Sequence, residues 1–370
     1  MTALRTFGFS LLVTVSALVA GYLHGGLNAL FLLVALGVLE VSLSFDNAII
    51  NAAILRRMSP FWQKMFLTIG ILTAVFGMRL LFPLVIVWVT AGLDPVRAMH
   101  LALNAPPHGA LAFPDGSPSY EKLLLAAHPQ IAAFGGTFLL MLFLDFVVQD
   151  RDIKWLKWIE VPFARIGRLG QVSVAVTAIA LTLAGTELTH TSDQRATVLT
   201  AGLLGLVTYL VVNGLARAFR PAVPDDDADE RPVPAVGKAA LTLFLYLEVL
   251  DAAFSLDGVT GAFAITSDPV VMALGLGLVG SIFVRSLTIY LVRQATLDRY
   301  VYLEHGAHWA IGALAVIMLI SIDQRHRLPE PITALVGVVV ITAAFGTSVW
   351  RNRRQARELA APELVSARRS

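Results

Sequence analysis

Apolar runs recur along the whole chain, and the short segments between them hold most of the charged residues. Each run has the roughly 20 residues that a helix needs to cross a hydrocarbon core about 30 Å thick. The alternating pattern of membrane β-strands does not occur in the sequence. The pattern predicts an all-α polytopic membrane protein with about ten transmembrane helices. The predicted spans are Thr6–Tyr22, Asn28–Ile50, Lys64–Ala91, Ile131–Val148, Gln171–Glu187, Ala196–Leu215, Lys238–Val259, Val270–Arg293, His308–Ile322 and Ile332–Trp350.

The composition supports a membrane protein whose first partner is the lipid bilayer. Hydrophobic residues make up 56% of the chain and charged residues 15%, and the mean hydropathy is +0.72. The net charge of +2, without a basic stripe interleaved with aromatics, argues against nucleic acid as a partner. Cysteine is absent, which excludes thiolate metal sites and disulfides. Thr6–Tyr22 resembles a signal peptide but lacks a strong basic flank and an A-x-A site, so we interpret it as an anchor.

The lysines and arginines predict the orientation. With both termini on the cytoplasmic side of an inner membrane, 21 of the 28 basic residues fall in inner segments and five in outer segments. The remaining two, Arg79 and Arg285, lie inside predicted spans. A miscounted helix would exchange inner and outer segments from that point on and remove the charge asymmetry. The asymmetry therefore favours ten spans.

Two connections differ from ordinary loops. Asp152–Arg168 places Trp155, Trp158 and Ile159 on one helical face, which predicts an amphipathic helix at the inner interface. Pro221–Pro234 is a Pro- and acid-rich linker between two halves. The expected units are residues 1–27, an N-terminal helix; 28–150, a first three-helix repeat; 151–237, the interfacial helix, two helices and the acidic linker; 238–323, a second three-helix repeat; and 324–370, the last helix and a basic tail.

The repeat is predicted from two clusters of polar residues. "LDAAFSLDGV" (Leu250–Val259) aligns without gaps on "LEVSLSFDNA" (Leu39–Ala48). A rival register sets the two "LEV" stretches, Leu39–Val41 and Leu247–Val249, on each other. In the first register Glu40 aligns with Asp251, Ser44 with Ser255, and Asp46 with Asp257.

Two further matches follow in the same order. The next span of each half carries an arginine, Arg79 and Arg285, and the span after that aligns His128 with His305. Five helices separate each matching pair, and because five is odd the copies would face opposite ways. Inverted repeats are typical of secondary transporters, with the substrate site near the midplane where the copies meet.

Carboxylates inside an apolar span are costly, at least about 2.5 kcal/mol each, and usually functional. Glu40, Ser44, Asn47 and Asn51 share one helical stripe, and Glu248, Asp251 and Ser255 form its equivalent. Asp46 and Asp257 fall off these stripes unless the helix unwinds near them. Asn47 and Gly258, which follow them, tolerate such breaks.

Acidic, amide and hydroxyl oxygens without cysteine suit Mn²⁺, Mg²⁺ or Ca²⁺ rather than Zn²⁺ or Cu⁺. The metal would be a substrate, with no permanently bound cofactor, and protonation of the carboxylates would release it. The predicted metal ligands are Glu40, Asp46, Asn47, Glu248, Asp251 and Asp257, supported by Ser44 and Ser255, with Arg79 and Arg285 balancing the charge. The alternative for a single acid is a structural hydrogen bond between helices, and for the arginines a counter-ion role.

"EVSLSFDNAII" and the second "SLDG" cluster resemble the TerC integral membrane family, which is linked to tellurium resistance and includes the Alx proteins. The similarity covers about residues 28–148 and 238–322, in what looks like a longer, uncharacterised branch of that family. It implies a relation to the lysine-exporter superfamily and, for this chain, manganese export. The family motif falls on Glu40, Asp46, Asn47, Asp251 and Asp257. The chain departs from the repeat in having Gly258 where the first copy has Asn47, and in having the extra acid Glu248.

Three functions remain open at this point. The first is a Mn²⁺ exporter coupled to protons. The second is a membrane scaffold in metal or tellurite stress, with a homo-oligomer or soluble stress proteins as partners, which the interfacial helix and acidic linker motivate. The third is an exporter of an organic cation or amino acid whose carboxylate meets Arg79 and Arg285. We do not expect an enzyme, because no nucleophile–base pair or phosphate loop occurs in the spans.

Overall fold

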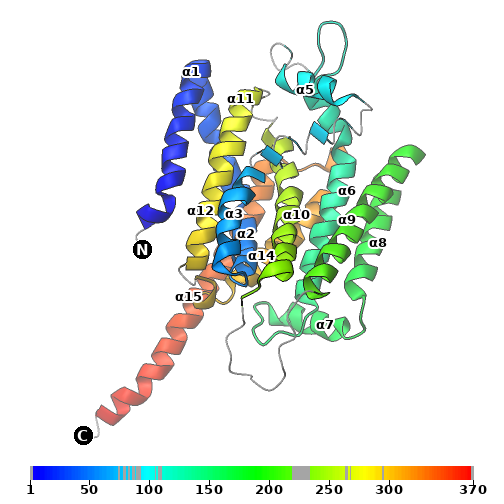
Figure 1. The fold of residues 1–370 in the computed structure, drawn as a ribbon. Coiled ribbons are helices and arrows are strands. Elements are labelled where there is room, and N and C mark those ends of the chain that lie inside the picture. The colour runs from blue at the N-terminus through cyan, green and yellow to red at the C-terminus, as the bar shows by residue number, and fades with distance from the viewer. Residues whose placement is uncertain are drawn as a thin grey trace.

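The chain folds into a bundle of helices (Figure 1). The computed structural model describes residues 3–73, 76–77, 81, 84–85, 88, 93–104, 106, 111–218, 234–262, 266, 268–293 and 296–367. These residues contain helices and turns and no β-strand. The helices are α1 Ala3–Leu43, α2 Phe45–Leu55, α3 Pro60–Leu72, α5 Pro95–Leu103, α6 Tyr120–Val147, α7 Lys157–Gly167, α8 Val172–Glu187, α9 Ser192–Ala218, α10 Gly237–Ala262, α11 Pro269–Met272, η3 Ala273–Gly280, α12 Ser281–Arg293, α13 Thr296–Arg299, α14 Leu303–Ile320, η4 Gln324–His326 and α15 Glu330–Ala367.

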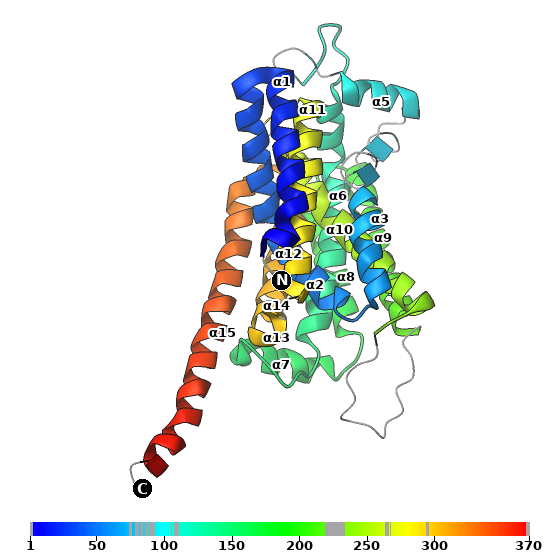
Figure 2. The ribbon, with the colours of Figure 1, turned by 60° about the vertical axis from the view of Figure 1, so that its left-hand side comes forward.

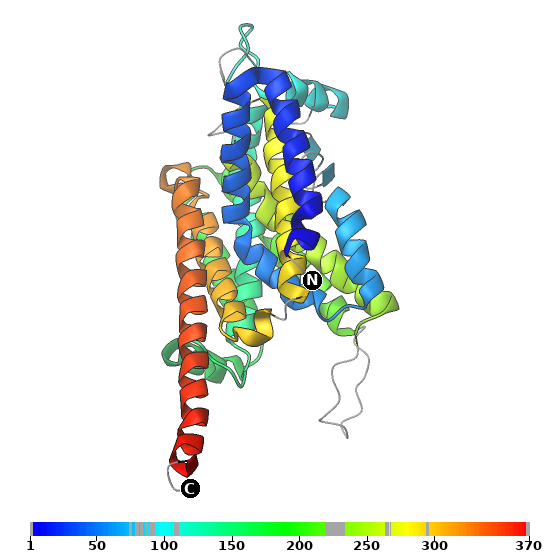
Figure 3. The same ribbon diagram turned by 90° about the vertical axis from the view of Figure 1, so that its left-hand side faces the viewer.

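Helix α1 is a hairpin of two arms. Its backbone leaves the helical region at Gly25 and Gly26, and Gly26 has a φ of +65°, which glycine adopts without strain. Figures 2 and 3 show the two blue arms running antiparallel from this turn. Gly21 lets the two arms approach closely. A Cβ at this position would lie only 2.7 Å from Cδ1 of Leu33. The turn lies between the first and second predicted spans.

A second break separates α1 from α2. Leu43 ends α1 and Phe45 begins α2, with Ser44 in a turn conformation between them (φ −98°, ψ 11°). The predicted unwinding near Asp46 therefore occurs two residues earlier. The corresponding prediction for the second half is wrong, because α10 continues as one helix through Gly258 to Ala262. A glycine tolerates a break, but it does not impose one while the helical hydrogen bonds continue.

The number of membrane spans is only partly established. Among the described residues, six helices are long and apolar enough to cross a bilayer, or seven if α7 and α8, bent by 103°, form one broken span. One of the six ranges, Phe7–Val38, contains the glycine turn of α1. An all-α polytopic membrane protein fits this structure. The predicted total of ten helices and the inverted repeat remain predictions.

The centre of the bundle is α6, which packs against α8, α9, α10 and α14. Glycines let α6 and α14 approach, since a Cβ on Gly312 would lie 2.7 Å from the Phe143 ring and one on Gly136 would lie 3.0 Å from Leu319. A second apolar cluster joins α1 to η3 around Leu33. The packing places α2, α10 and α12 side by side next to this centre.

Helix α7 lies across one end of the bundle, where the C-terminal part of α15 also extends, while α5 and the α1 turn lie at the other end (Figures 1 and 3). The predicted amphipathic face is partly wrong. Trp158 is 77% exposed, as expected at a lipid interface. Trp155 precedes the helix, which begins at Lys157, and its indole Nε1 donates to Thr347 of α15 at 2.9 Å. It therefore does not share the face of Trp158.

Candidate intramembrane carboxylate site

The predicted stripe of polar residues on the first half is buried. Glu40, Ser44, Asn47 and Asn51 follow the end of α1 and one face of α2, and their side chains are almost fully removed from solvent. The Ser44 hydroxyl donates to Oε1 of Glu40 at 2.8 Å. The break at Ser44 thus lies inside the polar stripe.

The stripes of the two halves meet. Asn47 Nδ2 on α2 donates to Oδ1 of Asp251 on α10 at 2.9 Å, and both side chains are buried. Helix α12 packs on α2 and brings Arg285 to the same region. The sequence separation of Asn47 and Asp251 shows that the tertiary fold, not local structure, builds this contact.

Arg285 contacts α3. Its Nη1 donates to the Phe66 carbonyl at 2.9 Å, and its guanidinium carbon lies 4.1 Å from the centre of the Phe66 ring. Its Nη2 lies 3.6 Å from Oε1 of Glu248 and 3.8 Å from Oδ2 of Asp251, too far for hydrogen bonds. The guanidinium therefore interacts electrostatically with both carboxylates, and its Nη2 is hydrogen-bonded to neither.

Two glycines make room for these charges. A Cβ on Gly70 would lie 2.5 Å from Nη1 of Arg285 and 2.9 Å from Oε1 of Glu248. A Cβ on Gly280 would lie 2.2 Å from Cγ of Glu40. Side chains at either position would displace charged groups of the site, so the small residues are part of its construction.

Several buried oxygens of the site lack hydrogen bonds. Neither oxygen of Glu248 has a hydrogen-bond partner among the described residues, and the same holds for Oδ1 of Asn51 and the hydroxyl of Ser281. These groups come from α10, α2 and α12. A buried polar atom without a partner costs about 1–3 kcal/mol, more when it is charged, so such atoms are rare outside functional sites.

The described part of the site holds three buried carboxylates, those of Glu40, Glu248 and Asp251, and one buried guanidinium, that of Arg285. Ionised groups inside a bilayer need a partner of opposite charge, a proton or a bound cation, because burying an uncompensated charge is costly.

Part of the predicted ligand set lies outside the described residues. This holds for Arg79 and for the side chains of Asp46, Ser255 and Asp257. Within the part that the structure describes, no group of three or more His, Asp or Glu side chains is arranged to hold a metal. The described acids therefore form a charged cluster with an arginine between two of them, rather than a closed metal cage.

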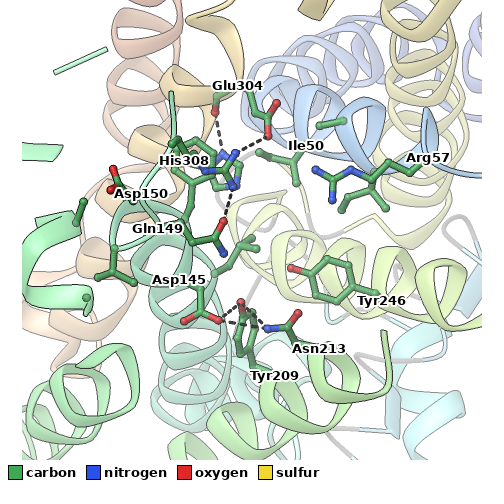
Figure 4. Close-up of a pocket in the computed structure, with 18 of the residues that line it drawn as sticks. Ile50, Arg57, Asp145, Gln149, Asp150, Tyr209, Asn213, Tyr246, Glu304 and His308 are labelled. Atoms are coloured by element: carbon green, nitrogen blue, oxygen red, sulfur yellow. Dashed lines mark hydrogen bonds and ion pairs between the residues drawn. The ribbon is translucent and has the colours of Figure 1, made fainter. Parts of the chain in front are cut away.

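Sequence reasoning missed a polar cavity of about 870 Å³ at the α7 end of the bundle (Figure 4). Asp145 of α6 lies in its wall and accepts hydrogen bonds from Tyr209 Oη at 2.9 Å and Asn213 Nδ2 at 3.3 Å. The signal was present, because Asp145 is an acid inside the span predicted at Ile131–Val148.

A buried structural acid, Glu160 of α7, was also missed. It accepts hydrogen bonds from Trp309 Nε1 at 3.1 Å and from the backbone N–H groups of Trp155 and Leu156 at 3.1 and 3.2 Å, and it lies 3.2 Å from Nδ1 of His305. Burial raises the pKa of Glu160, but the hydrogen bonds from His305 and Trp309 outweigh it and lower the pKa to about 2. Glu160 attaches α7 to α14.

The fold and the site define an all-helical membrane protein whose apolar interior encloses ionisable side chains. The chain belongs to the family described as a protein of unknown function (DUF475), which matches residues 45–355. The matched range includes Glu248, Asp251 and Arg285 and leaves out α1 with Glu40. No curated protein and no solved structure matches the chain.

Proposed function

We propose that this protein transports a divalent cation across the membrane in exchange for protons, and that the cation binds among Asn47, Glu248 and Asp251. The proposal rests on one observation above all. Glu248 is 5% exposed, lies next to a guanidinium, and has no hydrogen bond to either oxygen among the described residues. A carboxylate with a purely structural role would be saturated by donors.

The arrangement supports exchange of a cation against protons. A cation arriving between Glu248 and Asp251 competes with Arg285 for the same oxygens, and the guanidinium keeps its bond to the Phe66 carbonyl meanwhile. Protonation of the two acids lowers their affinity for the cation, and once the cation has left, Arg285 remains next to them. The oxygen-only ligands favour a hard cation, and the resemblance to the TerC family favours Mn²⁺ among these.

The orientation is proposed from the charges. The end of the bundle at which α7 lies carries Arg56, Lys154 and Arg168 in its connections, which is typical of a cytoplasmic side. We therefore propose an inner-membrane location with both termini cytoplasmic. Export as the direction of flow is proposed from the resemblance to the TerC family alone.

The test is Mn²⁺ flux into proteoliposomes under an imposed pH gradient. We expect Glu248→Gln and Asp251→Asn to lower the initial rate at least about 100-fold, because each removes a charge that a bound cation needs. The matched control is Glu187→Gln, an exposed acid at the other end of the bundle, which should keep the wild-type rate. Wild-type flux in both site variants would contradict the proposal.

A further inference from the structure

Helix α15 changes from apolar to basic within a few residues. Its segment Leu335–Gln355 is long and apolar enough to cross a bilayer, and it exposes large apolar side chains such as Phe345, at 42%, and Trp350, at 65%. Three arginines and no acid lie in the next four residues, Arg351–Arg354. A tryptophan followed by arginines is typical of the level where a span leaves the hydrocarbon core and reaches the lipid headgroups.

These arginines lie against the segment that joins α13 to α14. Asn352 Nδ2 donates to the Arg299 carbonyl at 2.7 Å, and the Tyr302 N–H donates to the Ser348 hydroxyl oxygen at 3.0 Å. The two hydrogen bonds place Arg299, the last residue of α13, against the residue that follows Arg351. Figure 2 shows α15 passing α13 and extending beyond the end of the bundle where α7 lies.

The two arginines at this contact are stacked on tyrosines. The guanidinium carbon of Arg351 lies 5.3 Å from the centre of the Tyr302 ring, and that of Arg299 lies 5.6 Å from the centre of the Tyr300 ring. Within the described part of the chain, neither guanidinium is paired with a carboxylate. A stacked guanidinium keeps its N–H donors in the plane of the group, where a phosphate can accept two of them in parallel.

The surroundings favour a phosphate that is attached to acyl chains. Phe345 and Trp350 precede Arg351 by six residues and by one, so they expose apolar surface on the hydrocarbon side of the arginines. A phospholipid would use both parts, its phosphate on the guanidiniums and its chains on the apolar surface. A soluble anion would use the arginines alone.

We propose that Arg299 and Arg351 together bind the phosphate of an anionic phospholipid in the leaflet at the α7 end of the bundle. Tyr300 and Tyr302 orient the two guanidiniums, and the other two arginines of Arg351–Arg354 add attraction at longer range. The bound lipid bridges α13 and α15. The site does not depend on the proposed transport, because none of its residues belongs to the carboxylate site.

The test uses the full-length protein in nanodiscs, with one fluorophore on Gly346→Cys. The chain has no cysteine of its own, and a Cβ on Gly346 would meet nothing within 4 Å. Phosphatidylglycerol or phosphatidylcholine with brominated acyl chains quenches the fluorophore, and the ratio of the two effects at equal mole fraction measures the local lipid preference. We expect phosphatidylglycerol to be preferred about tenfold, and Arg299→Gln or Arg351→Gln to lower this preference to about twofold.

Two further variants separate a built site from diffuse surface charge. Arg165→Gln is the matched control, because it removes one exposed positive charge from α7 at the same end of the molecule, and it should keep the wild-type preference. Arg351→Lys keeps the charge but not the planar group, so it should lose most of the preference, as Arg351→Gln does. Full preference in Arg351→Lys, or an equal loss in Arg165→Gln, would overturn the site.

Soluble glycerol phosphate in excess distinguishes a lipid from a free anion. It presents the same phosphate without acyl chains, and we expect it to leave the preference for phosphatidylglycerol unchanged. Displacement of the lipid by glycerol phosphate, or equal quenching by the two lipids around the unsubstituted arginines, would overturn the inference.

Discussion

Two buried glutamates of this protein have opposite surroundings. Glu160 is 3% exposed and is surrounded by the Trp309 indole, the His305 ring and two backbone N–H groups. Glu248 is 5% exposed, and among the described residues neither of its oxygens has a hydrogen bond and the Arg285 guanidinium lies 3.6 Å away. Burial alone therefore does not distinguish a structural acid from a functional one. The number of donors that satisfy the carboxylate does, because donors stabilise the folded state and leave no oxygen for a substrate.

The largest expected effect on stability is that of Glu160→Ala. This change leaves the Trp309 indole and two part-buried N–H groups without an acceptor, and we expect the free energy of unfolding to fall by about 3–5 kcal/mol. Thermal and chemical unfolding in detergent measures it. Glu248→Gln is the comparison and should keep or slightly raise the stability, because it removes a buried charge without a hydrogen bond. Equal losses in the two variants would end the distinction between the two acids.

The next effect tests the space around Arg285. Gly70→Ala should displace the guanidinium or Glu248, cost about 1–3 kcal/mol of stability, and lower Mn²⁺ flux. The matched variant is Gly77→Ala, where a Cβ would lie 3.4 Å from Thr73 in ordinary contact. It should keep flux and stability close to wild type. Equal fluxes in the two variants would show that Arg285 has no role in transport.

The pH dependence sharpens the comparison further. The pKa of Glu160 is lowered from 4.5 to about 2, so its stabilising contribution is complete above pH 4.5 and is lost as the pH falls toward about 2. We expect the wild-type stability to decline through this window more steeply than that of Glu160→Gln. Parallel curves for the two proteins would mean that the carboxylate is not stabilised in its charged form.

The smallest effect concerns the segment before α7. Trp155→Phe keeps the ring packing but removes the bond from the indole to Thr347, and we expect a loss of about 0.5–1.5 kcal/mol. The same unfolding measurement detects it, and Thr347→Val should give a similar loss that does not add to it. Additive losses would show that the two side chains do not interact in solution.

The sequence predicted the elements of this fold better than their relations. Runs of apolar residues predicted an all-α membrane protein, because lipid forces every backbone group to be satisfied within its own segment, and the total of ten spans stays a prediction. The stripe Glu40–Asn51 was predicted because a helical repeat places those residues on one face. Asn47 and Asp251 were predicted only as ligands of one site, and the hydrogen bond that joins them was not predicted.

The misses were long-range contacts without a local signal. Glu160 falls within the predicted interfacial helix Asp152–Arg168, and no role was predicted for it because no residue nearby in the sequence indicates Trp309 as its partner. The cavity at Asp145 is built from six helices, so no single segment encodes it. The helix break expected near Gly258 does not occur, because α10 remains helical through that position. In the first half the helix does break, since α1 ends at Leu43.

The first arm of α1 is attached to the helix that carries the arginine of the site. Ser10 is hydrogen-bonded to Ser286, and the Phe7 ring lies 5.4 Å from that of Phe283. If a cation binds between Glu248 and Asp251 as proposed, any displacement of α12, which carries Arg285, would therefore move the N-terminal arm with it. A fluorophore attached near residue 7 would report occupancy of the buried site from the edge of the bundle, without disturbing the acids themselves.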